Sequence, residues 1–372
     1  MGLQQRVALY RELEQHRGKP LVIYVTSTRE NSAGQISSDA IPELLTQLHA
    51  LPPDTQDIDL LVVSNGGDPT VAWRIVSLIR EQVKHFSILV PQAAFSAATL
   101  LALGADKIVM HPHGNLGPTD PQITNRKKAI QFGSEDVRAF LRFAREEVGL
   151  TDQKPLRDLF LRFSEEVGFV GIGVAARSAQ LSQAMAEGML GLHMKEDGKQ
   201  SARAISELLN KNYFHHGYPL NRKEAKQIGL KIEPSDETTE RLMWSIWKDI
   251  EQDLKLKEPF LPIHQLKSDP ACSALFSPVP QVSYPPGIGQ QQLQMLMMAI
   301  AQQIAAERVP PTSYEVVVGL MESPRHASLA RVKGSIFGAR QPDLEFKVQI
   351  VPEVNGWVDV PIPPAQQVQQ PS

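Results

Sequence analysis

Apolar, β-branched runs alternate with amphipathic stretches along the N-terminal third of the chain. The predicted strands are residues 21–25, 58–63, 87–90 and 107–110. The predicted helices between them are residues 41–51, 70–84 and 96–103. A strand followed by a helix and then by another strand is the pattern of parallel βαβ units. The hydrophobic pattern therefore predicts an α/β fold that begins with a parallel sheet.

Helical patterns dominate the chain after residue 112. They fall at residues 134–148, 155–166, 175–188, 202–212, 223–228 and 239–256. A sheet with an apolar face has to bury that face against other elements. We therefore expect these helices to form a cover over the sheet.

A dense set of prolines separates this region from the C-terminal part, since seven prolines lie between residues 258 and 289. Beyond them come one helical pattern and three strand-like runs, at residues 290–307, 314–320, 332–337 and 344–351. Prolines stiffen a connection and prevent a continuous helix. The predicted organisation is a domain over 1–257, a proline-rich linker over 258–289, a small C-terminal α+β module over 290–362 and a disordered tail over 363–372.

Composition narrows the functional classes. The net charge is −3 with a pI near 6.4, so no basic surplus points to nucleic acid or to acidic lipid as a partner. The single cysteine, Cys272, excludes an intramolecular disulfide and a zinc site of the cysteine-cluster kind. The N-terminus lacks an apolar signal region, and the most apolar window, 95–110, is too short to span a membrane. We expect a soluble, cytoplasmic protein with no integral membrane segment.

Two turns carry candidate chemistry. The first is the run SNGGDP at 64–69, which follows the strongest predicted strand and precedes a helix. Paired glycines at Gly66 and Gly67 leave backbone N–H groups open at a helix N-terminus, where a developing oxyanion is stabilised. A tight turn that needs positive φ is the plainer interpretation of the same residues. A dinucleotide site is disfavoured, because G-x-G-x-x-G is absent from the sequence.

The second turn contains Ser96, again between a strand and an apolar helix, in the run AFSAAT at 94–99. A serine at such a turn can present its hydroxyl to a substrate, with the N–H of Ala97 aimed at the same point. An ordinary helix N-cap is the alternative. Both turns fall at the carboxyl ends of parallel strands, where open α/β sheets gather their ligand sites.

The order of these runs resembles the serine dehydrogenase proteinase family. That family belongs with signal peptide peptidase A and the Clp proteolytic subunit in the ClpP/crotonase superfamily. The runs are SNGGDP (64–69), AFSAAT (94–99), GADKIVM (104–110) and GPTDP (117–121), with HGYP (216–219) and EAKQIGL (224–230) at the end of the fold. The resemblance covers roughly residues 20–232.

This resemblance implies a ClpP/crotonase-type spiral of βα units with a helical cover. It implies a serine peptidase that hydrolyses peptide bonds through an acyl-enzyme on Ser96. The oxyanion hole would be formed at Gly66, Gly67 and Ala97, with the N–H groups of Gly67 and Ala97 as donors. The partners it implies are a peptide or protein substrate and further copies of the chain in a homo-oligomer.

The general base departs from the family pattern. Signal peptide peptidase A offers a lysine on a later helix, where the best register here puts Arg142, and arginine stays protonated. The Clp subunit offers a histidine in the loop after the nucleophile, where this chain has Asp120. His216, oriented by Asp120, is then the candidate base, because a histidine ordinarily loses its proton near neutral pH.

Other assignments of the base stay open at this point. His215 and His216 could cap the preceding helix, and Lys127 or Lys128 could be the base in place of His216. His111 and His113, in a His-Pro-His run, are expected to shape a turn.

Two other functions also compete with the peptidase. One is a crotonase-type acyl-CoA enzyme, which would use the same N–H groups to hold a thioester enolate. The other is a catalytically inactive scaffold in the peptidase fold. No cofactor and no metal are expected, and no lysine site for pyridoxal phosphate stands out.

Overall fold

The computed structural model of this chain describes residues 2–125, 130–194, 199–211, 213, 215–276, 286–305, 310–341 and 345–362. One mixed sheet of eight strands runs through the molecule in the order β10-β5-β3-β2-β1-β11-β12-β13. The five strands at one end pair in parallel: β1 (Leu21–Thr26), β2 (Asp57–Val63), β3 (His85–Val90), β5 (Lys107–Met110) and β10 (Ile232–Glu233). The four strands predicted from the first part of the sequence are therefore confirmed.

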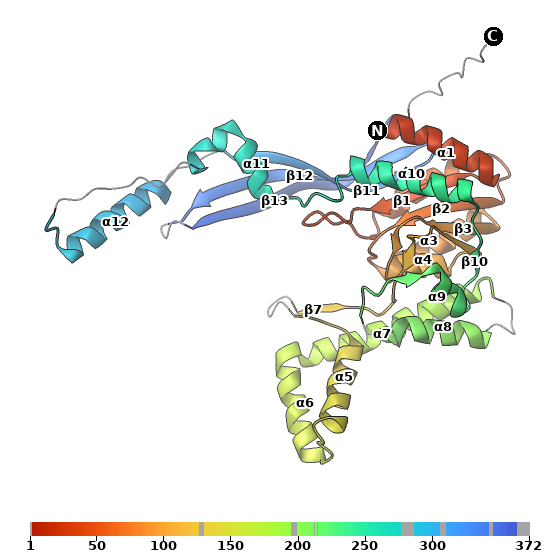
Figure 1. The fold of residues 1–372 in the computed structure, drawn as a ribbon, viewed down its shortest axis with the longest axis horizontal. Coiled ribbons are helices and arrows are strands. Elements are labelled where there is room, and N and C mark those ends of the chain that lie inside the picture. The colour runs from red at the N-terminus through yellow and green to blue at the C-terminus, as the bar shows by residue number, and fades with distance from the viewer. Residues whose placement is uncertain are drawn as a thin grey trace, which may run out of the picture.

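Helices cover both faces of the parallel strands, which explains why these strands are apolar in continuous runs. One face packs against α2 (Ala40–His49), α3 (Pro69–Gln82), α4 (Ala97–Leu103), α7 (Phe169–Gly191), α8 (Lys199–Lys211) and α9 (Arg222–Gln227). The other face packs against α1 (Leu3–Arg17) and α10 (Glu237–Asp253), which lie side by side in Figure 1. The α/β fold of the ClpP type, with its helical cover, is thus confirmed.

The helix α1 was not among the predicted elements, and its buried face shows why. Val7, Tyr10 and Leu13 of this helix are buried, but so is Arg6, which is only 1% exposed. Arg6 forms ion pairs with Asp249 at 2.7 Å and with Glu322 at 2.9 Å. A buried arginine that is satisfied by distant carboxylates interrupts the hydrophobic pattern from which helices are predicted.

Two helices form an arm beside the main body. They are α5 (Ser134–Glu146) and α6 (Gln153–Val167), and both pack against the first turns of α7. Figure 1 shows the arm projecting away from the sheet, below α7. A small cluster that includes Phe132, Val137 and Ala175 holds the arm to the hairpin of β7 (Ile123–Asn125) and β8 (Ile130–Phe132).

The C-terminal strands form an antiparallel ribbon, β11 (Thr312–Glu322), β12 (Ala327–Arg340) and β13 (Phe346–Asp359). Because β11 pairs with β1, from Ile23↔Glu322 to Thr26↔Gly319, the ribbon continues the sheet of the first domain. The helices α11 (Pro262–Ser268), η2 (Pro270–Phe276) and α12 (Gln290–Ala305) precede it, and α12 lies near its far end in Figure 1. The predicted α+β composition of this part is present, whereas its division into linker, module and tail stays a prediction.

Three two-residue strands complete the fold near the N-terminus of α4. These are β4 (Ala93–Ala94), β6 (Asn115–Leu116) and β9 (Leu220–Asn221), which form a separate small sheet. In this sheet β4, just before α4, pairs with β6, and β6 pairs with β9. Because β6 directly precedes residues 117–121 and β9 directly follows residues 216–219, the sheet brings both segments close to the start of α4. Within the described residues, no helix has the length and apolar character needed to cross a membrane.

Candidate active site

The glycine turn after β2 is held by a buried serine. Ser64 Oγ accepts a hydrogen bond from the N–H of Gly66 at 3.0 Å and lies 2.6 Å from Thr26 Oγ1. Gly66 and Gly67 have φ values of 109° and 152°, which L side chains rarely adopt. A Cβ on Gly67 would lie 2.3 Å from the carbonyl oxygen of Ile36, so only glycine fits between these backbones.

Ser96 sits on a strained turn that lies directly against the glycine turn. It has φ 53° and ψ −116°, a conformation that is costly for a residue with a side chain. A Cβ on Gly66 would lie 2.7 Å from Ser96 Cβ, so the two turns are in contact. Ser96 occupies the N-cap position of α4, yet its side chain makes no capping hydrogen bond. The local fold thus leaves the Ser96 hydroxyl available for another role.

Two backbone N–H groups beside Ser96 have no acceptor among the described residues. Ala97 opens α4, so its N–H has no partner inside the helix. The N–H of Ile36 donates to Gly66 O, and the N–H of Asp68 donates to Ile36 O, both at 2.8 Å. The N–H of Gly67, between these two bonds, donates to neither backbone oxygen. These donors are of the kind that stabilises an oxyanion.

Thr99 joins the Ser96 turn to the segment that carries Asp120. Its side chain is fully buried, and its Oγ1 lies 2.7 Å from the carbonyl oxygen of Ala94. The same oxygen lies 2.9 Å from Gly117 O and accepts the N–H of Gly117 at 3.0 Å. One hydroxyl therefore fixes α4 and the Gly117–Asp120 segment to each other, a role that the sequence analysis did not assign.

Asp120 and His216 meet although 96 positions separate them in the sequence. His216 Nδ1 lies 2.8 Å from Asp120 Oδ1, and the side chains are 33% and 16% exposed. When His216 donates its Nδ1–H to this carboxylate, its Nε2 is left as an acceptor for a proton. The neighbouring Thr119 is anchored by its N–H to Leu209 O at 2.9 Å and by Ser182 Oγ at 2.5 Å from its carbonyl oxygen.

One cavity of about 440 Å³ collects most of the predicted site residues. Its lining includes Gly66, Gly67, Ser96, Ala97 and His216. A second cavity of about 380 Å³ is lined by both Asp120 and His216. The two cavities therefore share His216, whereas Asp120 lines only the second.

Comparison with known proteins agrees with this geometry. The family model of the ClpP-like SDH-type serine proteinases matches residues 4–132. That segment is similar to the ClpP-like serine proteinases. It includes both turns, Ser96 and Asp120, and it ends before Arg142 and His216. The predicted resemblance is confirmed for this part of the chain.

Individual relatives are more distant. An uncharacterized protein of Methanocaldococcus jannaschii is 26% identical over 236 residues, which are 61% of this chain and 73% of that protein. The 1510-N membrane-bound stomatin-specific protease, a lysine-to-alanine mutant in complex with a substrate peptide, is 16% identical with a TM-score of 0.36, over 59% of this chain and 78% of that one. ClpP1 from Listeria monocytogenes is 13% identical with a TM-score of 0.31, over 62% and 99%.

The other candidate bases lie elsewhere or outside the described residues. Arg142, the residue in the lysine register, is exposed on α5 and lines the second cavity rather than the Ser96 cavity. Lys127 and Lys128 lie outside the described residues. The His215 ring accepts the N–H of Gly217 at 3.0 Å, so it stabilises the turn next to His216.

The His-Pro-His run contributes to structure on another face. His111, His113 and Trp244 stack on one another, with ring centroids 5.0 to 5.6 Å apart. Burial lowers the pKa of His111, and its Nδ1 accepts the N–H of His113 at 3.1 Å. Neither histidine lines the Ser96 cavity, which agrees with the turn-shaping role predicted for them.

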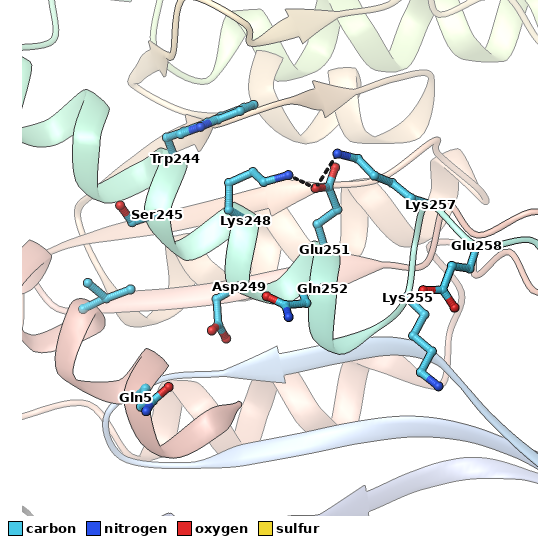
Figure 2. A pocket seen from close by; sticks show the side chains of 11 residues that line it. Gln5, Trp244, Ser245, Lys248, Asp249, Glu251, Gln252, Lys255, Lys257 and Glu258 are labelled. Atoms are coloured by element: carbon cyan, nitrogen blue, oxygen red, sulfur yellow. Dashed lines mark hydrogen bonds and ion pairs between the residues drawn. The ribbon is translucent and has the colours of Figure 1, made fainter. Parts of the chain in front are cut away.

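Two further groups of polar residues lie away from the Ser96 site. A cavity of about 650 Å³ between α1 and α10 is larger, but Figure 2 shows its Lys248 and Lys257 both directed at Glu251, as an internal ion-pair network. Among the described residues, one group places possible metal-ligand atoms within 4.8 Å of one another, namely Glu43, His326 and Asp359. None of these three lines the Ser96 cavity.

Proposed function

We propose that this chain is a serine peptidase in which Ser96 is the nucleophile, His216 the general base and Asp120 the residue that orients the imidazole. The observation that carries the proposal is the shared cavity, which brings the Ser96 turn, the glycine turn and His216 to one space. Asp120 Oδ1 lies 2.8 Å from Nδ1 of that histidine, which leaves Nε2 as the nitrogen that can accept a proton.

The proposed reaction begins when Ser96 Oγ attacks the carbonyl carbon of a peptide bond and transfers its proton to His216 Nε2. The carbonyl oxygen becomes an oxyanion that accepts the N–H groups of Gly67 and Ala97, each donor contributing about 2.7–4 kcal/mol in the transition state. The C–N bond then breaks, and His216 returns the proton to the leaving amine. Water, activated by the same imidazole, releases the acyl group from Ser96.

The character of the cavity favours a peptide over an acyl-CoA. Apart from His216, no titratable side chain lines it within the described residues. A coenzyme A thioester carries several phosphates, whose negative charge proteins commonly bind with lysine or arginine. A neutral stretch of peptide backbone has no such requirement, so the lining supports a peptide substrate.

A covalent probe tests the proposal. The protein should react with a biotinylated fluorophosphonate, and intact mass and peptide mapping should locate one adduct on Ser96. Ser96→Ala should remove the adduct and peptide hydrolysis while leaving the melting temperature close to that of the wild type. A crotonase-type enzyme would give no adduct on Ser96, and an inactive scaffold would give neither adduct nor hydrolysis. Either result would exclude the peptidase.

A further inference from the structure

The carboxylate of Asp120 is held from both of its oxygens. Oδ1 faces His216 Nδ1, and Oδ2 accepts a hydrogen bond from Gln122 Nε2 at 2.8 Å. Within the described part of the chain, the one ion pair of Asp120 is with His216. Among the described residues, the second oxygen is therefore bonded by a neutral amide and not by a lysine or an arginine.

The base of the β7–β8 hairpin leaves space for this amide. Gln122 immediately precedes β7 and Gly133 immediately follows β8, and the first pair of the hairpin is Ile123↔Phe132. A Cβ on Gly133 would lie 3.1 Å from Gln122 Nε2, tighter than nearly all real contacts of a Cβ. The glycine and the glutamine therefore fit each other at the site where the amide reaches Asp120.

We propose that Gln122 is a positioning residue that acts on His216 through Asp120. This inference rests on the proposed function, since it assigns a part in the same proton transfer. A carboxylate that is held by one donor can rotate, whereas a second donor on Oδ2 fixes its plane toward the imidazole. Because the donor is neutral, the full negative charge of Asp120 stays available to stabilise the imidazolium that forms when Ser96 gives up its proton.

The chain supplies a matched control in Gln131. It is the same residue type, it lies on the partner strand of the same hairpin, and it lines both cavities together with Gln122 and His216. Gln131 does not bond to Asp120 in the described structure. Methionine has a side chain of similar length to glutamine but lacks the amide. Both replacements therefore remove one amide, but only Gln122→Met removes a donor to the Asp120 carboxylate.

The decisive measurement does not need hydrolysis. In the Ser96→Ala background, the hydrogen-bonded Nδ1 proton of His216 should give a downfield proton NMR resonance, assigned by its loss in His216→Ala. Gln122→Met should shift this resonance upfield or broaden it beyond detection, whereas Gln131→Met should leave it in place. Equal spectra for the two methionine variants would overturn the positioning role. If Gln122→Met alone shifts the His216 resonance but the protein with Ser96 intact hydrolyses no peptide, the positioning role stands and the proposed function is refuted.

Kinetics give the second readout. Gln122→Met should lower kcat about tenfold with little change in KM, because the amide acts on the proton transfer and not on substrate binding. Because Gln131 also lines the Ser96 cavity, Gln131→Met is the control for the NMR resonance and for stability, and kcat is compared with that of the wild type. If Gln122→Met lowers the melting temperature more than its control does, Gln122→Glu decides the question, since it keeps the shape and loses the N–H donor. A Gln122→Glu protein with the wild-type resonance and wild-type kcat would also refute the role.

Discussion

The two halves of the site are built in different ways. The nucleophile half, with Gly66, Gly67 and Ser96, lies on two turns that follow buried strands and contact each other through their backbones. The base half, Asp120 and His216, comes from segments outside the parallel sheet that meet across 96 positions of sequence. The first half depends on backbone geometry that a few local residues impose, and the second depends on tertiary packing.

This difference affects how each half can vary. The family match covers the nucleophile half and Asp120, and it ends before His216. A turn that only glycine can occupy leaves little freedom for substitution, whereas a base can be supplied by any segment that reaches the nucleophile.

The largest effect is expected from replacing the candidate base, and this replacement distinguishes His216 from the other candidates. His216→Ala should lower kcat by about 10²–10⁴-fold, the usual contribution of a general base, when initial rates of peptide hydrolysis are measured. Asp120→Asn should lower it less, because the imidazole remains but loses the carboxylate that orients it. His215→Ala is the control, since His215 contacts Gly217 and not Asp120.

A different outcome would move the base to another segment. If Lys128→Met silences hydrolysis while His216→Ala leaves it unchanged, the site is a serine–lysine dyad. In that case only the nucleophile half of the proposal would stand.

The sequence was sufficient to predict where the two turns of the nucleophile half lie, because their signals are local. Strands, turns and the small residues around Ser96 follow one another within a few positions, so the hydrophobic pattern and the turn chemistry determine where they lie. The pairing of β11 with β1 was not predicted, because the hydrophobic pattern of residues 314–320 indicates a strand but not its partner. The helix α1 was missed for a related reason, since the partners that satisfy Arg6 lie at Asp249 and Glu322.

The base half could be predicted only by exclusion. Nothing in the sequence near His216 indicates that its ring reaches Asp120, and the prediction of that pair relied on the absence of other bases in the right places. Gln122 lies outside every run singled out in the sequence, and Thr99 ends the run AFSAAT without any indication there that its hydroxyl bonds to Gly117. Side-chain hydrogen bonds between distant segments are decided by packing, which the local pattern does not contain.

The second prediction tests the rigidity of the nucleophile half. Gly67→Ala should destabilise the protein by about 3 kcal/mol, because the new Cβ would meet the Ile36 backbone and the φ of 152° is unfavourable for alanine. The close backbone contact makes loss of folding the first consequence of a larger residue here, ahead of any change in turnover. Urea unfolding followed by circular dichroism measures the change.

Gly173→Ala is the matched control, because a Cβ at this position in α7 would meet nothing within 4 Å. This variant should unfold at the same urea concentration as the wild type or at a slightly higher one, since alanine favours a helix. If Gly67→Ala is as stable as Gly173→Ala, the glycine turn is not constrained in the way that its backbone contacts require.

The smallest expected effect concerns Thr99, the residue that joins the two halves. Thr99→Val keeps the shape of the side chain and leaves the buried N–H of Gly117 without its acceptor, which should cost about 1–3 kcal/mol of stability. Because Gly117 leads directly to Asp120, the same change should also lower kcat, by less than His216→Ala does. Thr46→Val, on the exposed side of α2, is the control for the loss of a threonine hydroxyl. Thermal unfolding and initial rates of the two variants provide the comparison. If Thr99→Val loses stability but keeps the wild-type kcat, the base half holds its geometry without this hydroxyl, and the two halves of the site are coupled through other contacts.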